Sequence, residues 1–139
     1  MHIRSFRTAD QPEVIALWEK CNLTRPWNDP SKDIARKMDV QAELFLVGVV
    51  EETLMASVLG GYEGHRGWIN YLAVSPAYRG RGYGRALMTR IEELLVIMGC
   101  PKINIQVRAT NSEVLEFYRA LGYQQDDVVS LGKRLIADD

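Results

Sequence analysis

The segment PAYRGRGYGRALM, residues 76–88, constrains the fold of this chain more than any other part of the sequence. Glycines stand at positions 80, 82 and 84, and arginines at positions 79, 81 and 85. Glycine tolerates positive φ and lets a ligand approach the main chain closely. The apolar run YLAV (71–74) precedes the segment, and an apolar pattern with helical spacing follows it. The pattern therefore predicts a strand, a tight turn and a helix in succession.

The turn into this helix has the chemistry of a phosphate site. The first N–H groups of a helix have no intrahelical partner, and the helix dipole favours an anion beside them. Arginine adds a planar guanidinium that fits phosphate oxygens, and glycine lets those oxygens reach the backbone. A flexible surface turn with solvated arginines is the alternative interpretation of the same residues.

The spacing of the glycines argues against two common nucleotide motifs. The motif G-x-G-x-x-G needs a glycine five residues after its first glycine. Here Arg85 stands five residues after Gly80, and Leu87 stands five residues after Gly82. A Walker A loop needs G-K-[ST], and that triplet is absent from the sequence. The motif that remains is Arg79-x-x-Gly82-x-Gly84 at the start of a helix.

The length of 139 residues predicts one domain, residues 1–139, and hydrophobic periodicity predicts the α/β class. Strands are expected at 1–7, 44–50, 54–62, 68–74 and 103–107, with EGHRG (63–67) as a hairpin tip. Helices are expected from Asp10 to Cys21, from Asp29 to Met38, from the glycine turn to Met98 and from Asn111 to Leu121. Two short strands, near 123–126 and 128–135, are expected to close the chain. This order predicts a mixed, mostly antiparallel sheet flanked by about four helices.

Composition argues against several classes of function. The net charge is −1, which disfavours a DNA- or RNA-binding protein. No apolar run approaches the length of about 20 residues that spans a bilayer. The N-terminus MHIRSFRTAD has no apolar signal region, so we expect a cytoplasmic protein. The two cysteines lie far apart and the chain has two histidines, so we expect no metal site.

Two segments resemble the signatures of the GNAT-type N-acetyltransferases. The acetyl-CoA motif of that family reads Q/R-x-x-G-x-G/A between a strand and a helix, as residues 79–84 do here. NSEVLEFYRALGY (111–123) is similar to the second signature, an Asn followed seven residues later by a Tyr and then L-G-Y/F. The likeness covers essentially the whole chain. It implies a GNAT-like fold and transfer of an acetyl group from acetyl-CoA to a primary amine, on a small molecule, a protein N-terminus or a lysine.

The resemblance also implies which residues bind acetyl-CoA. Backbone amides of the glycine turn would hold the CoA pyrophosphate, and the strand before it would pair with the pantetheine arm and polarise the thioester carbonyl. The turn residues are Arg79, Gly80, Arg81, Gly82, Tyr83, Gly84 and Arg85, and the strand residues are Leu72, Ala73 and Val74. A plain buried strand is the alternative for residues 72–74, and both interpretations can hold.

Asn111 and Tyr118 complete the implied cofactor site. Asn111 would bond the pantetheine amide, and capping the helix is its alternative role. Tyr118 would give a proton to the departing CoA thiolate. A phenol with a pKa of about 10 stays protonated at neutral pH and can act as hydrogen-bond donor or general acid. A core tyrosine on the face of Val114 and Leu121 is the alternative.

The acceptor side matches the family less well. Some members that acetylate ribosomal proteins carry a Glu general base in the strand before V-R-A-x-N, where this chain has Gln106. Gln106 cannot take a proton at neutral pH, which leaves Glu63, His65 and Asp29 as candidates for a base. Each of the three has a turn or a helix cap as its alternative role. Trp27 and Asp29 are expected to border the acceptor amine through cation–π attraction and charge.

Other functions stay open on the sequence alone. A catalytically silent acyl-CoA-binding module that regulates a partner is the alternative function, and Gln106 keeps it open. The sequence does not identify the acceptor amine, the acyl length or the oligomeric state, and a homodimer is one alternative.

Overall fold

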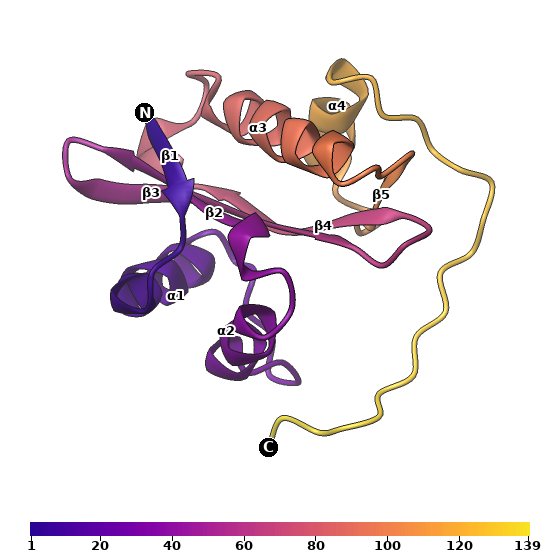
Figure 1. Ribbon diagram of the computed structural model, residues 1–139, viewed down its shortest axis with the longest axis horizontal. Coiled ribbons are helices and arrows are strands. Elements are labelled where there is room, and N and C mark those ends of the chain that lie inside the picture. The colour runs from indigo at the N-terminus through magenta and orange to yellow at the C-terminus, as the bar shows by residue number, and fades with distance from the viewer.

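Residues 1–139 form a five-stranded sheet with helices on both faces, as the computed structural model shows (Figure 1). The strands are β1 (His2–Ser5), β2 (Phe45–Val50), β3 (Thr53–Tyr62), β4 (Gly67–Val74) and β5 (Ile103–Ile105). They lie in chain order across the sheet; β1 to β4 are antiparallel neighbours, and β5 runs parallel to β4. The predicted α/β class and the mostly antiparallel sheet are confirmed.

Each face of the sheet has its own pair of helices and its own core. The helices α1 (Gln11–Lys20) and α2 (Pro30–Met38) cover one face, and α3 (Tyr83–Ile97) and α4 (Ser112–Ala120) cover the other (Figure 1). Leu87, Ile91 and Leu95 are buried, which confirms the predicted apolar face of α3. Met98, where this helix was expected to end, is the C-cap of α3 and is 37% exposed. None of the helices has the length and apolarity that crossing a membrane requires.

Asp10 ties β1 to the first helix. It stands at the N-cap of α1, as the sequence predicts, but its carboxylate makes no cap hydrogen bond there. The carboxylate instead accepts two hydrogen bonds from the Arg4 guanidinium, at 2.7 and 2.9 Å, and one from the Arg7 N–H at 2.8 Å. The Asp10 side chain is 10% exposed. The bonds from Arg4 lower the pKa of Asp10.

Asp10→Asn is expected to lower the free energy of unfolding by about 1.5–3 kcal/mol, the range for hydrogen bonds to charged groups. Because the pKa of Asp10 is lowered in the folded chain, its stabilisation is present above the ordinary carboxyl pKa and is lost as the pH falls through the lowered value. Urea unfolding at neutral and acidic pH should therefore show a difference between parent and variant that shrinks in acid. Glu19→Gln, at an exposed position near the end of α1, is the control. Equal stability of parent and Asp10→Asn at neutral pH would contradict the prediction.

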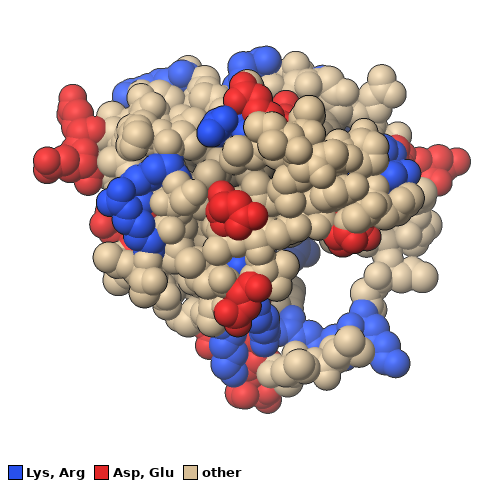
Figure 2. Space-filling view, in the orientation of Figure 1, with Lys and Arg blue, Asp and Glu red and all other residues tan.

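The two strands predicted near 123–126 and 128–135 are wrong, because neither a strand nor a helix follows α4. The segment after α4 runs away from the sheet in an extended course and returns toward α2 (Figure 1), and open space separates part of it from the body (Figure 2). A strand needs a ladder of backbone hydrogen bonds to a neighbour. The neighbouring strand β5 ends after three residues, so it offers little ladder to extend.

No backbone–backbone hydrogen bond connects this last segment to β5 or α2, and each contact involves at least one side chain. Beside β5, Lys102 pairs with Asp126 at 3.0 Å and Gln106 donates to Ser130. At the end of the chain, the Asp138 carboxylate accepts from the Asp29 N–H at 2.8 Å and pairs with Arg36 and Arg134. The large apolar side chains of this segment, which favoured the strand prediction, are exposed; they are Val128, Val129, Leu131, Leu135 and Ile136. The segment therefore has the composition of a strand but no neighbouring strand with which to pair.

Candidate functional site

A bulge in β4 shapes the site. Its pairing with β3 shifts register between Ser57 and Leu59, and Tyr71 has φ 50°, in the left-handed region. The buried Ser57 supports this backbone: its hydroxyl donates to the Tyr71 carbonyl at 2.8 Å and accepts from the Trp18 indole at 2.9 Å. The Tyr71 ring stacks on Trp18 with centroids 3.8 Å apart, and its hydroxyl donates to Asp33 at 2.7 Å. Burial and the Asp33 bond raise the pKa of Tyr71.

Beyond the bulge, β4 loses its partner on the β5 side. The pairs between β4 and β5 end at Ile69 and Ile105, whereas β4 continues to Val74. The predicted pantetheine residues 72–74 therefore have an open backbone edge. An open strand edge can pair with an extended ligand as a further strand would. The Val74 carbonyl already accepts from the Arg79 Nε at 3.0 Å.

The glycine turn follows directly from this open edge. Gly80 and Gly82 have φ of 78° and 81°, and no heavy atom lies within 4 Å of the place that a Cβ would take at either position. None of the N–H groups of residues 80–85 donates a hydrogen bond within the chain. Free N–H groups at the start of the 15-residue helix α3 form a site for an anion.

Gly84 is needed for a different reason. A Cβ at this position would lie 3.1 Å from Cζ of Phe117 and 3.3 Å from its Cε1. The missing side chain therefore lets α4 pack against the first turn of α3. This packing brings the second signature, on α4, beside the glycine turn.

The arginines of the turn are exposed, and each is held by one neighbour. Arg79 reaches back to β4, Arg81 lies 5.5 Å from the ring centroid of Tyr78, and Arg85 donates to the Ala120 carbonyl at 3.5 Å. The remaining guanidinium N–H groups make no hydrogen bond within the chain. They can therefore add charge-assisted hydrogen bonds to an anion there.

Asn111 and Tyr118 lie on α4 as predicted. The Asn111 Oδ1 accepts from the Val114 N–H at 3.3 Å, so the capping contact is present; its contact with pantetheine stays a prediction. Tyr118 is 8% exposed, and its ring packs edge-on against Phe117 and Tyr123. The Tyr118 hydroxyl has no partner within the chain and is not among the fully buried unpaired groups, so it reaches solvent. Burial raises the pKa of Tyr118 to about 12.

The predicted acceptor residues do not converge on one place. Glu63 is exposed at the β3–β4 hairpin tip, where its Oε1 accepts from the N–H groups of Arg66 and His65 and these bonds lower its pKa. Asp29 caps α2 by accepting from the Ser31 N–H at 2.8 Å. Trp27 is 57% exposed. Glu63 borders a cavity of about 240 Å³ between α2, the end of β3 and β4, and neither Trp27 nor Asp29 lines it.

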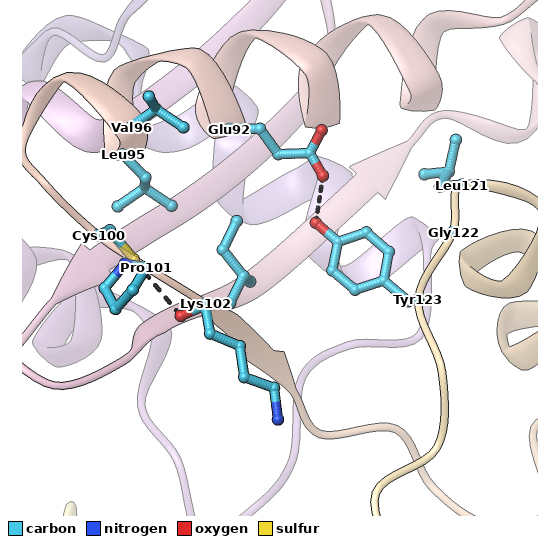
Figure 3. Close-up of a pocket in the computed structure, with 10 residues that line it drawn as sticks. Glu92, Leu95, Val96, Cys100, Pro101, Lys102, Leu121, Gly122 and Tyr123 are labelled. Carbon is cyan, nitrogen blue, oxygen red and sulfur yellow. Dashed lines mark hydrogen bonds between the residues drawn. The ribbon is translucent and has the colours of Figure 1, made fainter.

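A separate cavity of about 390 Å³ lies between α3, β5 and the end of α4, and Figure 3 shows residues that line it. Its walls include Leu95, Cys100 and Tyr123, and the Tyr123 hydroxyl donates to Glu92 across it. The cavity lies at the C-terminal half of α3, whereas the free N–H groups lie at its N-terminus. We therefore do not assign it to the anion site.

The sequence model of the acetyltransferase (GNAT) family matches residues 11–123 of the chain. This chain belongs to the GNAT acetyltransferase family. A relative from Yersinia pestis (strain Pestoides F), named acetyltransferase, is 54% identical over 138 residues, which are 99% of this chain and 98% of the relative. A relative from Yersinia pseudotuberculosis serotype I (strain IP32953), also named acetyltransferase, matches to the same extent.

Solved GNAT structures share the fold. An aminoglycoside antibiotic 6′-N-acetyltransferase from Acinetobacter haemolyticus matches with a TM-score of 0.75 and 19% identity, covering 98% of this chain and 100% of that one. The ribosomal-protein-S18-alanine N-acetyltransferase from Escherichia coli matches with a TM-score of 0.74 and 22% identity, covering 90% and 78%. At these identities the likeness shows the fold alone.

The GNAT family uses acetyl-CoA as co-substrate, and the residues of this site fit that molecule. The free N–H groups of the glycine turn suit a pyrophosphate, and the open edge of β4 suits an extended amide-bearing arm. Sequence reasoning missed the bulge at Tyr71 and its support from Ser57. The available signal was one polar residue, Ser57, inside the otherwise apolar run LMASVL (54–59).

Proposed function

We propose that this GNAT acetyltransferase moves the acetyl group of acetyl-CoA to a primary amine by direct attack in a ternary complex. The observation that carries the proposal is the continuity of the open β4 edge with the free N–H groups of residues 80–85. One extended ligand can pair with the edge and place its pyrophosphate at the start of α3.

The proposed roles follow the order of the bonds that change. N–H groups within Leu72–Val74 polarise the thioester carbonyl while the amine nitrogen forms its bond to the carbonyl carbon. The C–S bond then breaks, and the Tyr118 hydroxyl donates a hydrogen bond to the sulfur, which leaves with the electron pair. Asn111 holds the pantetheine amide. The amine gives up its proton to water or to a base.

None of the candidate residues on the acceptor side is a strong base for deprotonating the amine. Glu63 has a lowered pKa, which weakens it as a base, and Gln106 is neutral. An α-amine with a pKa of about 7.8 is neutral at about the 10% level at neutral pH, whereas a lysine amine with a pKa of about 10.4 is neutral in roughly one part in 2,500. The site therefore favours acceptor amines of low pKa.

Free thiol release tests this function. The protein is incubated with acetyl-CoA and a panel of primary amines, and CoA thiol is measured with time. Amine-dependent release supports acetyl transfer. Stabilisation by acetyl-CoA without release from any amine would support the alternative, a silent acyl-CoA-binding module.

The charge distribution does not favour a nucleic-acid phosphate ligand for the arginine segment. Basic and acidic side chains are interspersed on the face that Figure 2 shows, and the net charge of the chain is −1. Nucleic-acid binding draws on a continuous basic surface.

A further inference from the structure

A second cavity, of about 240 Å³, lies on the α1/α2 face of the sheet beside the bulge. Its walls come from α2 and the residues after it, from the end of β3 and from β4. On β4 the cavity is lined by Asn70, two residues before Leu72, where the proposed thioester contacts begin. Two residues span at most about 7 Å, the value for an extended strand. A molecule in this cavity can therefore extend an amine toward the open edge of β4.

Lys37 supplies positive charge to the inner wall of this cavity. Its Nζ donates to the Gly60 carbonyl at 2.5 Å and joins no salt bridge in the structure. Lys37 is half-buried, and burial lowers its pKa although Glu43 opposes the shift. An ammonium group with one carbonyl partner keeps two N–H donors and an uncompensated charge. An anionic ligand in the cavity would satisfy both.

The polar groups near Lys37 are arranged to admit such a ligand. The side chains of Asn70 and Trp68 line the cavity, are exposed and make no hydrogen bond within the chain. Gln41 is already occupied, because its amide bonds both the N–H and the carbonyl of Tyr62. The one carboxylate at the cavity, Glu63, is exposed at the rim and is bound to hairpin N–H groups.

We infer that this cavity binds the acceptor and that the acceptor is a primary amine carrying a carboxylate, which Lys37 binds as its counter-ion with Asn70 as a second donor. The inference rests on the proposed function and specifies its substrate class. Lys37 is then a specificity residue: it recognises the carboxylate while the amine reaches the thioester.

The test compares two acceptors of the same skeleton, L-glutamate and L-glutaminamide, in which both carboxylates are replaced by amides. Lys37→Gln keeps a donor for the Gly60 carbonyl but removes the charge, and Lys37→Arg keeps the charge. Lys20→Gln, at the exposed end of α1, is the control for losing one lysine elsewhere. Thiol release gives the KM of each acceptor for each protein.

Lys37→Gln is expected to raise the KM for L-glutamate about ten-fold or more, equivalent to about 1.4 kcal/mol, and to change the KM for L-glutaminamide by less than about two-fold. Lys37→Arg should restore most of the preference for L-glutamate. Equal changes for both acceptors in Lys37→Gln would overturn the inference, because the ratio of variant to parent KM for one acceptor does not depend on the pKa of its amine.

Calorimetric titration of L-glutamate into protein saturated with CoA separates this inference from the proposed function. If Lys37→Gln weakens the binding of L-glutamate, the result supports the carboxylate site. If, in addition, no amine releases thiol, only the proposed transferase activity is wrong. If thiol release does not depend on Lys37 and parent and variant bind glutamate equally, the carboxylate site is wrong. The proposed transferase activity then still stands.

Discussion

Acetyl-CoA is expected to raise the melting temperature of the parent protein by roughly 10 °C and to leave that of Gly82→Val almost unchanged. A ligand that binds only the folded state at about 100 times its Kd adds about 2.7 kcal/mol to the free energy of unfolding. Gly82 has φ 81° and ψ 11°, a conformation that a β-branched residue strongly disfavours. Relaxing to an allowed conformation would turn the N–H groups of residues 80–85 away from their common focus.

The cause of this loss can be separated from general destabilisation. No atom of the chain lies within 4 Å of a Cβ at Gly82, so Val would strain the backbone rather than clash with the protein. Gly99, at the other end of α3, has φ 87° and equally open surroundings. Gly99→Val should therefore lower the melting temperature of the free protein by a similar amount and retain the shift with acetyl-CoA. A full shift in Gly82→Val, or loss of the shift in both variants, would remove the glycine turn from the cofactor site.

The glycine turn could be predicted because its determinants are local. Positive φ at Gly80 and Gly82, the free N–H groups and the start of α3 all follow from residues within a few positions of one another. The hairpin tip and the cap at Asn111 are local in the same sense. Features of this kind depend on residues close together in the sequence, so periodicity and turn chemistry predict them.

The features that the sequence did not predict depend on distant partners. The bulge at Tyr71 exists through its pairing with β3 and the support of Ser57, and the cavity beside it needs Lys37 from α2. The last residues, 123–139, have the composition of strands, but strand formation also requires a partner edge that the short β5 does not offer. Pairing register and edges are properties of the folded sheet, which local patterns do not specify.

Tyr118→Phe is expected to lower kcat by about 10²-fold or more and to leave the Kd of acetyl-CoA and the melting temperature near the parent values. The phenyl ring fills the same buried position. The hydroxyl has no partner within the chain, so its removal leaves no protein group unpaired. Single-turnover kinetics with a reactive amine measures the chemical step directly.

Tyr123→Phe is the matched control for this substitution. Tyr123 packs against Tyr118, but its hydroxyl donates to Glu92 on α3. Its removal should therefore lower the free energy of unfolding by about 1–3 kcal/mol, because Glu92 loses its partner, while kcat stays close to the parent value. The two variants thus have opposite signatures, one in rate and the other in stability.

The pKa of Tyr118 decides what its hydroxyl contributes. Full transfer of a proton from a phenol with a pKa of about 12 to a thiolate whose conjugate pKa is about 8.5 is uphill by about 4.8 kcal/mol. A hydrogen bond to the sulfur avoids this cost and stabilises the charge that forms as the C–S bond breaks. Because burial keeps the phenol protonated well above neutral pH, the ratio of parent to Tyr118→Phe kcat should stay constant from neutral pH to about pH 10. Equal kcat in both proteins, with the chemical step rate-limiting, would assign Tyr118 to packing.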